Sequence, residues 1–344
     1  MGVSSATKSG KYYESKKMKE KLGSLLQKFK LPRMIYVKPG KYNLIHSSRG
    51  IIPLNMRPWV IDMEHVHSFF GLNPKLMKNK FWRKFIEKKL ASKNCKAILC
   101  HCEATRQAFF RYLDCSKFKD KIKILYPSSH IIPIKKEKHD KIRILAILSL
   151  FEHKGGLQIL EAFSQLDKKY KNIELWLRAD VPESFKKKYN SKNIKYMDYF
   201  KDIIPRERLL KEVYSKCDIF LYPTFCDSFG YSLIDAMVAK LPIIGTNMFA
   251  VPEIVEDGKN GFVINIPGYS LKDNFLQYYP IENLTKKDNE IFIRGLFKSL
   301  EKLIKDKKLR EKMSKESFRL VNTGKFSIKE RNKKLLVAYG VKNG

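Results

Sequence analysis

The sequence predicts an α/β protein of two parallel-sheet domains, and three observations carry this prediction. Residues 219–222 are an apolar run that stops at Pro223, a helical pattern follows, and residues 241–244 are a second apolar run. Strand, helix and strand within about 30 residues form a βαβ unit of a parallel sheet. The same alternation occurs on both sides of a charged connector at residues 135–141, and a length of 344 residues suits two domains.

Basic residues dominate the charged part of the sequence. There are 69 Lys and Arg against 35 Asp and Glu, which gives a formal net charge of +34. A field of this size favours anionic partners, namely phospholipid surfaces, nucleotide-sugars or nucleic acid. The alternative is a set of ordinary solvated faces, because the lysines occur along the whole chain. We expect no nucleic-acid partner, since the sequence contains no recognised nucleic-acid-binding module.

Residues 12–31 form a basic amphipathic pattern. Helical spacing, with lysines in between, is shared by the apolar residues Met18, Leu22, Leu25, Leu26 and Phe29. Such a helix could lie on an anionic membrane, or it could pack on the sheet as a first helix, which is the interpretation we favour. The sequence shows no secretory signal and no apolar run near 18 residues. We therefore expect a cytoplasmic protein, soluble or peripheral on the inner face of a membrane.

The six cysteines predict free thiols rather than a metal site. Four of them lie in the first half of the chain, and Cys100-His101-Cys102 places two thiols beside an imidazole. Adjacent residues on a strand point to opposite faces, so this tripeptide is a poor chelate. Reduced cytosolic thiols are the better interpretation.

The loop at residues 223–230 is the candidate ligand site. It follows a parallel strand and opens a helix, and such sheets bind ligands at the carboxyl ends of their strands. Free amides and the helix dipole there suit an anion such as a diphosphate. Asp227 and Asp235 bracket the region, and eight helical residues span about 12 Å, the length of a nucleotide-sugar. Asp235 could bind ribose and Asp227 the sugar; alternatively, Asp227 only caps the helix and Asp235 is solvated.

This stretch resembles the donor site of the retaining GT-B glycosyltransferases of family 4, also called group 1 glycosyltransferases. The motif reads D-S-F-G-Y-S-L-I-D-A-M-V-A-K-L-P-I-I, followed by F-A-V-P-E-I-V-E-D-G-K-N-G. The family has glutamates at Asp227 and Asp235, a glycine at Lys240, and a Gly-Gly pair at Phe249-Ala250. The resemblance covers most of residues 40–320 and is strongest over 218–264.

The resemblance implies the GT-B fold, in which two Rossmann-like, doubly wound parallel-sheet domains face a cleft. We place an N-terminal, acceptor-side domain at residues 1–136 and a C-terminal, nucleotide-sugar-binding domain at residues 137–326. Residues 327–344 are expected to form a C-terminal helix, which such proteins often return to the first domain.

The resemblance also implies site residues on both sides of the cleft. Lys154-Gly155 matches the family's diphosphate-binding lysine, and Ser149 stands where the family has an arginine. His65 follows the strand at residues 59–63, where the family has a histidine beside the donor sugar. The residues expected to act in catalysis are Asp227, His65 and Lys154. The residues expected to bind the donor are Ser149, Lys154, Ser228, Phe229, Gly230, Ser232, Leu233 and Asp235.

The activity implied by the resemblance is the transfer of a hexose from a nucleotide diphosphate sugar to an acceptor hydroxyl on a glycan or lipid-linked sugar. We expect no cofactor and no catalytic metal, because no acidic D-x-D cluster stands at a strand end. Lys154, the helix N-terminus near residues 228–230 and the amides near 232–233 would neutralise the leaving diphosphate. Two alternatives stay open. One is a nucleotide-sugar epimerase of the same fold, and the other is a degenerate, non-catalytic binding module, suggested by Ser149, Asp227 and Phe249.

Overall fold

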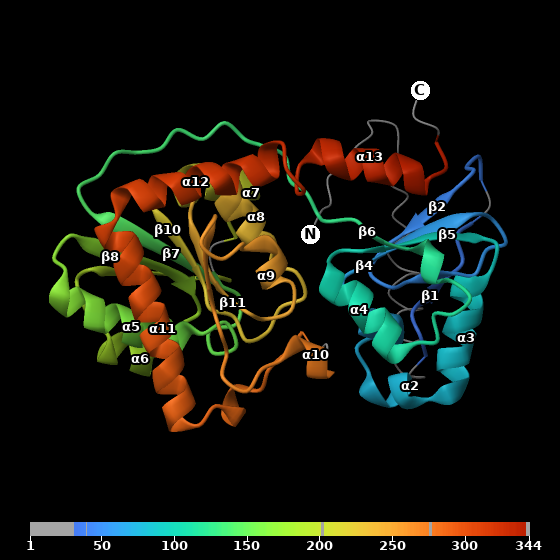
Figure 1. The fold of residues 1–344 in the computed structure, drawn as a ribbon, viewed down its shortest axis with the longest axis horizontal. Helices are drawn as coiled ribbons and strands as arrows, with labels where there is room; N and C mark the ends of the chain where they lie inside the picture. The colour runs from blue at the N-terminus through green and yellow to red at the C-terminus, as the bar shows by residue number, and fades with distance from the viewer. Residues whose placement is uncertain (1–30, 39, 201–202, 275–276, 342–344) are drawn as a thin grey trace.

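The computed structural model describes residues 31–38, 40–200, 203–274 and 277–341. Two parallel sheets, each with its own helices, lie side by side along the long axis of the molecule (Figure 1). This arrangement confirms the α/β class and the two Rossmann-like sheets that the sequence predicts. The amphipathic helix expected at residues 12–31 falls outside the described residues, apart from Leu31.

The N-terminal half is built on a four-stranded parallel sheet in the order β2-β4-β5-β6. Its strands are β2 (Ile45–Ser47), β4 (Trp59–Met63), β5 (Cys95–Cys100) and β6 (Ile122–Ile124). A separate parallel pair joins β1 (Met34–Ile35) to β3 (Ile52–Pro53). The helices of this half are η1 (Val66–Phe70), α2 (Pro74–Lys78), α3 (Lys80–Ala91), α4 (Glu103–Tyr112) and η2 (Lys119–Lys121).

The C-terminal half contains a six-stranded sheet in the order β12-β11-β10-β7-β8-β9, and all its neighbours are parallel. Its strands are β7 (Ile142–Leu148), β8 (Ile173–Ala179), β9 (Ile194–Met197), β10 (Ile219–Tyr222), β11 (Ile243–Thr246) and β12 (Gly261–Ile264). Its helices include α5 (Gly156–Lys169), α6 (Glu183–Lys188), α7 (Arg206–Glu212), η3 (Tyr214–Lys216), α8 (Tyr231–Val238), α9 (Val251–Ile254), α10 (Leu271–Asn274), η4 (Ile281–Asn283) and α11 (Lys286–Lys305).

Strand β11 begins two residues later than the sequence pattern predicts. The expected strand at residues 241–244 is observed as Ile243–Thr246. The Leu241 N–H donates to the Ala236 carbonyl and so closes the end of α8. Pro242 has no N–H to give to a ladder, which leaves Ile243 as the first residue that can pair.

Strand β4 shows how the N-terminal sheet is buried on both faces. Successive side chains of a strand point to opposite faces, so Trp59, Ile61 and Met63 share one core while Val60 faces another. All five residues of β4 are buried, as is typical of a parallel strand covered on both sides. Asp62 is the charged exception, and it therefore needs polar partners.

The last two helices run along one side of the molecule and span both halves. Figure 1 shows α12 (Lys307–Asn322) over the C-terminal half and α13 (Ile328–Ala338) over the N-terminal half. Leu335 of α13 packs in one cluster with Val60 and Leu99 of the N-terminal sheet. Beyond the helix, the Tyr339 hydroxyl lies 2.6 Å from Nδ1 of His46. The end of the chain thus packs on the sheet of the first half.

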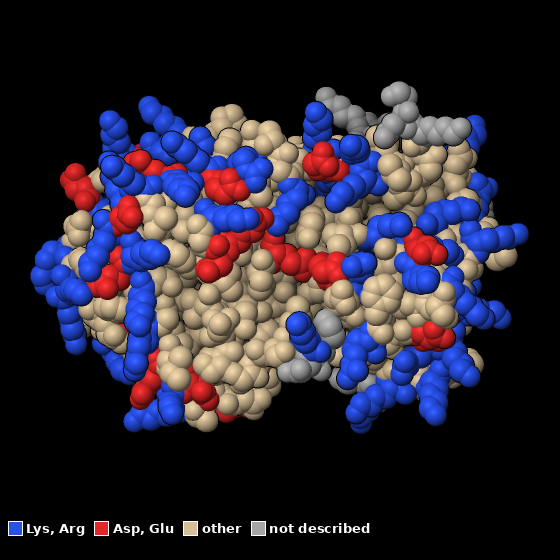
Figure 2. Space-filling view, viewed as in Figure 1, with Lys and Arg blue, Asp and Glu red and all other residues tan. Residues whose placement is uncertain are grey.

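Lysine and arginine side chains are numerous on the face of the molecule that Figure 2 shows. Figure 2 shows them over the periphery of both halves, with a short band of Asp and Glu near the middle of this face. Across the described residues, no helix combines the length and apolar character that crossing a membrane requires.

Candidate active site

The loop at residues 223–230 joins the carboxyl end of β10 to the start of α8. Gly230 sits at the helix N-cap with φ of +91°, and a Cβ there would lie 2.8 Å from the Leu233 side chain. Glycine adopts this left-handed conformation at no steric cost. The sharp turn leaves the first amides of α8 at the edge of the sheet where parallel-sheet proteins bind their ligands.

A second turn brings Lys154 against this loop. Gly155 has φ of +74°, and a Cβ there would collide with the carbonyl oxygen of Pro223. The missing side chain therefore permits the turn after β7 to touch the loop after β10. Lys154 is only 8% exposed, and its Nζ forms an ion pair with the Asp227 carboxylate. Nζ also lies 3.2 Å from the hydroxyl of Tyr222.

The Asp227 carboxylate is held by three donors. Oδ2 accepts from Lys154 and from the Tyr222 hydroxyl, and Oδ1 accepts from the Phe229 N–H at 3.1 Å. Burial alone would raise the pKa of Asp227, but the charge of Lys154 and these hydrogen bonds outweigh it and hold the pKa below its usual value. Asp227 therefore stabilises the loop and also presents an ionised carboxylate beside a lysine.

Asp235 is half-buried and paired with an arginine. Nε of Arg206, the first residue of α7, donates to Oδ1 of Asp235 at 2.7 Å. Burial raises the pKa of Asp235, and the charge and hydrogen bond of Arg206 offset only part of that effect. The Arg206 side chain is 35% exposed and that of Asp235 is 17% exposed, so the pair lies at the border of the site.

Two loop residues face the N-terminal half. The Ser228 hydroxyl donates to Oε2 of Glu64 at 3.4 Å. The Phe229 side chain is fully buried, and its ring stands edge-on to the His101 imidazole, with centroids 6.4 Å apart. The donor loop predicted from the sequence is thus also a contact surface between the two halves.

The remaining donor-binding candidates lie at the end of β7 and in the first turn of α8. Ser149 directly follows β7 and is partly buried. The Ser232 carbonyl accepts from the Tyr214 hydroxyl at 3.4 Å, and the Leu233 side chain is buried in the core. The structure brings Lys154, Asp227 and the start of α8 together, and in the described part of the chain no hydrogen bond joins Ser149 to them.

His65 is a buried side chain at the start of η1. Its Nδ1 accepts from the His67 N–H at 3.1 Å, which is an N-capping contact. Its ring lies 5.2 Å from that of Phe249, which follows β11 in the other half. Phe249 has φ of +40° and is 1% exposed. A phenylalanine in the left-handed region is unusual, and this one occupies the position of a family glycine and fills the space beside His65.

Glu253 in α9 connects the two halves. Its carboxylate accepts from the Glu103 N–H at 2.7 Å, from the Ala104 N–H at 2.8 Å and from the Tyr126 hydroxyl at 3.0 Å. The two amides are the first of α4, where a negative charge also meets the positive end of the helix dipole. Burial nevertheless raises the pKa of Glu253, with these hydrogen bonds opposing it.

The sequence analysis did not single out Tyr222, Arg206 or Glu253 as functional residues. Tyr222 is the last residue of β10, where the ends of parallel strands gather polar groups, and that position was the available signal. Arg206 carries no such local signal, because its partner lies 29 residues away in the sequence. Glu253 stands within the resembled motif F-A-V-P-E-I-V, but its partners in α4 lie about 150 residues away, so the motif did not reveal its contact.

The cysteines do not form a metal centre in the described structure. All six are free, and within the described ranges no group of three or more His, Cys, Asp or Glu side chains is arranged to hold a metal ion. Cys100 and Cys102 are buried, and burial raises the pKa of both thiols. Both are therefore protonated thiols at neutral pH.

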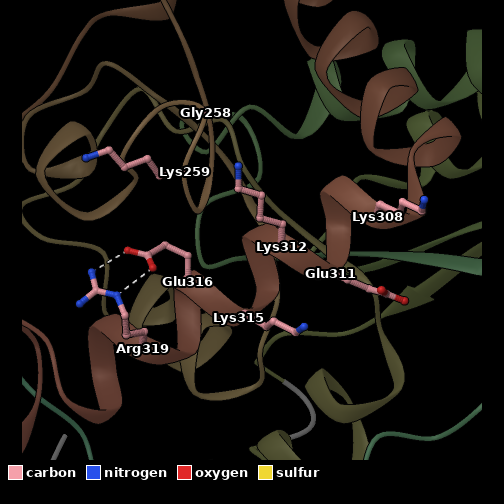
Figure 3. Close-up of a pocket in the computed structure, with 8 residues that line it drawn as sticks. All are labelled: Gly258, Lys259, Lys308, Glu311, Lys312, Lys315, Glu316 and Arg319. Atoms are coloured by element: carbon pink, nitrogen blue, oxygen red, sulfur yellow. Dashed lines mark hydrogen bonds and ion pairs between the residues drawn. The ribbon is translucent and has the colours of Figure 1, made fainter.

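An open groove lies on the outer side of α12, far along the chain from the loop at 223–230. Figure 3 shows Lys312, Lys315 and Arg319 of α12 opposite Lys259, with Arg319 bonded to Glu316. The lining residues are Gly258, Lys259, Lys308, Glu311, Lys312, Lys315, Glu316 and Arg319. It includes none of the candidate site residues and is distinct from the candidate active site.

Solved structures identify the fold class as GT-B. Sucrose-phosphate synthase from Thermosynechococcus elongatus matches with a TM-score of 0.64 at 13% identity, over 96% of this chain and 80% of that one. Anabaena Alr3699/HepE in complex with UDP-glucose matches with a TM-score of 0.59 at 13% identity, over 96% of this chain and 86% of that one. At these identities the likeness establishes the fold.

Sequence comparison confirms the resemblance to the group 1 glycosyltransferases. Residues 128–273 match the family model described as glycosyl transferases group 1. An uncharacterized glycosyltransferase from Haemophilus influenzae is 27% identical over 247 residues, which is 71% of this chain and 65% of that protein. The O-antigen chain mannosyltransferase RfbU from Salmonella typhimurium is 22% identical over 65% of this chain and 62% of its own length. The chain thus matches slightly less than two thirds of these relatives.

Proposed function

We propose that the protein is a retaining glycosyltransferase that moves a hexose from a nucleotide diphosphate sugar to an acceptor hydroxyl on a glycan or lipid-linked sugar, without a catalytic metal. The observation that supports this most is the meeting of Lys154 and Asp227 beside the N-terminus of α8. A leaving diphosphate there would meet a positive charge and free amides, and a sugar would meet a carboxylate.

In the proposed reaction, the bond between the anomeric carbon and the diphosphate oxygen breaks, and its electron pair leaves with the diphosphate. Lys154 and the amides of α8 stabilise the charge that develops on that oxygen. The acceptor oxygen bonds to the anomeric carbon on the face that the diphosphate leaves, and the acceptor proton passes to the departing diphosphate. Asp227 holds the sugar, where positive charge develops, and Asp235 holds the ribose.

We propose UDP-hexoses as the first donors to test, because one structural neighbour, Anabaena Alr3699/HepE, was solved with UDP-glucose. Thermal unfolding would be measured with UDP-glucose, UDP-N-acetylglucosamine and GDP-mannose, since a ligand of the folded state raises the unfolding temperature. On a stabilising donor, Asp235→Ala should chiefly raise the donor KM, while Asp227→Asn should chiefly lower kcat. Unchanged turnover in Asp227→Asn would contradict the role assigned to Asp227.

A second candidate is a non-catalytic nucleotide-sugar-binding module. It is favoured by two features, namely that Asp227 is already held by Lys154 and Tyr222, and that Phe249 occupies the position of a family glycine. This candidate requires that a donor stabilises the protein while neither transfer nor donor hydrolysis occurs. Failure of every donor to stabilise the protein would contradict both candidates.

We also propose that the protein works at the cytoplasmic face of an anionic membrane. The support is electrostatic, because the chain carries a net charge of +34 and its lysines are spread over the visible surface (Figure 2). Flotation with phosphatidylserine-containing vesicles should show binding at low salt that disappears as salt is added. Deletion of residues 1–31 tests whether that basic segment supplies the contact. Absence of binding at low salt would contradict the proposal.

A further inference from the structure

A polar cluster lies at the carboxyl ends of β4 and β5 in the N-terminal half. It faces the loop at residues 223–230 of the C-terminal half, which we call the donor loop. His101 directly follows β5, and its backbone N–H donates a hydrogen bond to the Met63 carbonyl at 2.9 Å. Glu64 directly follows β4 and receives the Ser228 hydroxyl at 3.4 Å. Ser228 is the neighbour of Asp227 in sequence. The cluster is therefore next to the loop in which we place the donor sugar.

One nitrogen of His101 has no partner among the described residues. The side chain is almost completely buried, and Nδ1 is shielded from solvent without a hydrogen bond. A buried polar atom left in this way costs roughly 1–3 kcal/mol, so it indicates a missing partner. Nε2 lies 4.0 Å from Oδ2 of Asp62. The negative charge favours a proton on Nε2, and Nδ1 is then a hydrogen-bond acceptor that requires a donor such as a hydroxyl.

A chain of polar contacts connects this imidazole to Tyr339, a residue that is distant in the sequence. Oδ2 of Asp62 also lies 3.5 Å from Nε2 of His46, and Nδ1 of His46 lies 2.6 Å from the Tyr339 hydroxyl beyond α13. Burial would raise the pKa of Asp62, but the contacts with His101 and His46 reverse that and hold it well below its usual value. Asp62 therefore remains ionised, and its carboxylate lies on the Nε2 side of the His101 imidazole.

The other wall of the cluster comes from α8. Tyr231 is 49% exposed, and its ring lies 5.5 Å from that of Phe229, which stands edge-on to His101. Burial raises the pKa of Tyr231, and the nearby charges of Glu64 and Asp62 raise it further, while Arg49 and Arg331 oppose this effect. The half-buried Glu64 and the exposed Tyr231 give the cluster an open side. Carboxylate, imidazole and phenol groups form hydrogen bonds with hydroxyls, whereas the lysine and amides of the donor loop suit an anion.

We propose that Glu64, His101 and Tyr231 form the binding site for the acceptor hydroxyls, and that Asp62, His46 and Tyr339 position His101. This inference rests on the proposed function, because it places the second substrate next to the proposed donor loop. It names the acceptor as a polyhydroxyl compound bound through neutral and acidic groups. His101 and Glu64 act by binding, and no covalent step is assigned to them.

The test measures the binding of hydroxyl compounds in the presence of UDP, with NMR saturation transfer on the full chain. The probes are methyl α-D-glucoside, methyl α-D-mannoside and myo-inositol. At least one should bind to the natural protein, and His101→Gln and Glu64→Gln should weaken it by about tenfold, as the loss of one such hydrogen bond predicts. Tyr339→Phe should weaken it less, because it acts through His46. UDP should bind to His101→Gln and Tyr339→Phe as it does to the natural protein.

His139→Gln is the matched control. His139 pairs with Asp218 at 3.5 Å, much as His46 pairs with Asp62, but Asp218 precedes β10 and so lies at the opposite edge of its sheet. This variant should retain full probe binding. If no probe binds to the natural protein, or if binding persists in both His101→Gln and Glu64→Gln, the acceptor site is wrong. If the natural protein does not bind UDP, the proposed function is contradicted instead. Circular dichroism would show that each variant folds.

Discussion

The Lys154 ammonium and the Asp227 carboxylate form an ion pair between two loops that are 73 residues apart in the sequence. The side chains are only 10% and 17% exposed, so each charge depends on the other for compensation. The pair keeps the turn after β7 against the loop after β10. It also presents one positive and one negative group at the start of α8, where we propose that the donor binds.

Replacing Lys154 should weaken donor binding far more than replacing a surface lysine. We expect Lys154→Ala to lower the affinity for a stabilising nucleotide-sugar at least tenfold, whereas Lys298→Ala, on the exposed face of α11, should have no measurable effect. Lys154→Ala should also lower the free energy of unfolding by about 3 kcal/mol, because Asp227 is left buried without its counter-charge. Titration calorimetry and chemical denaturation measure the two effects. Equal, small effects of both substitutions would contradict the phosphate role.

Tyr222→Phe should separate the hydrogen bond to Asp227 from the packing of the ring. The substitution removes only the hydroxyl that donates to Asp227 and accepts from Lys154. We expect a loss of about 1.5–3 kcal/mol in the free energy of unfolding, as for a hydrogen bond to a charged group. The pKa of Asp227 should rise, since one of the contacts that lower it is gone. Denaturant unfolding and carboxyl-carbon NMR titration would measure these changes, and an unchanged titration would show that Tyr222 does not control Asp227.

The two aspartates should respond to pH in opposite directions. The pKa of Asp227 is lowered, so its contribution to stability is present above its usual value of 3.8 and is lost as pH falls through the folded pKa. The pKa of Asp235 is raised, so its contribution is present below 3.8 and is lost as pH rises through the folded pKa. Asp227→Asn should therefore lower the free energy of unfolding most at pH 7 and least at pH 3. Asp235→Asn should lower the free energy of unfolding most at pH 3. Denaturation across this range checks the prediction, and parallel profiles would refute it.

Glu253→Gln should weaken the contact between the two halves. A carboxylate can accept from both α4 amides with its two oxygens, whereas a glutamine amide has only one acceptor oxygen. We expect faster proteolysis in the connector at residues 135–141 and a larger radius of gyration in small-angle X-ray scattering. Glu256→Gln, which disrupts a contact with Lys325 within the C-terminal half, is the control and should leave both measurements unchanged. If Glu253→Gln changes neither the proteolysis rate nor the radius of gyration, other contacts hold the two halves together.

Lys240→Gly should stabilise the protein relative to Lys240→Ala. Lys240 has φ of +57°, and this left-handed conformation costs a residue with a Cβ about 1 kcal/mol. Its Nζ also lies 4.7 Å from the centre of the Phe318 ring, a contact that both substitutions remove. The difference between the two variants thus isolates the backbone strain, and we expect about 1 kcal/mol in favour of glycine. Thermal unfolding measures it, and equal stabilities would mean that the strain is negligible.

Much of the fold could be predicted because its signals are local. The apolar runs and the Pro223 stop gave β10, and the Lys154-Gly155 pair marked a turn before a helix. The observed start of β11 lies two residues after the predicted start, because Leu241 completes α8 instead of starting a strand. That competition is between two backbone hydrogen bonds, and apolar periodicity carries no information about which of them forms.

The sequence by itself predicted the alternation of strands and helices, and it singled out the candidate donor loop and the candidate residues Lys154, Asp227 and Asp235. Their spacing and turn chemistry are properties of short segments, and a resemblance in motif could reveal them. Only the tertiary structure decided which side chains meet. It joined Lys154 to Asp227, Arg206 to Asp235, Glu253 to α4, and His101 to Asp62. These contacts arise where loops from different strands converge and where two halves pack together, because burial makes each charged group find a partner that no local pattern specifies.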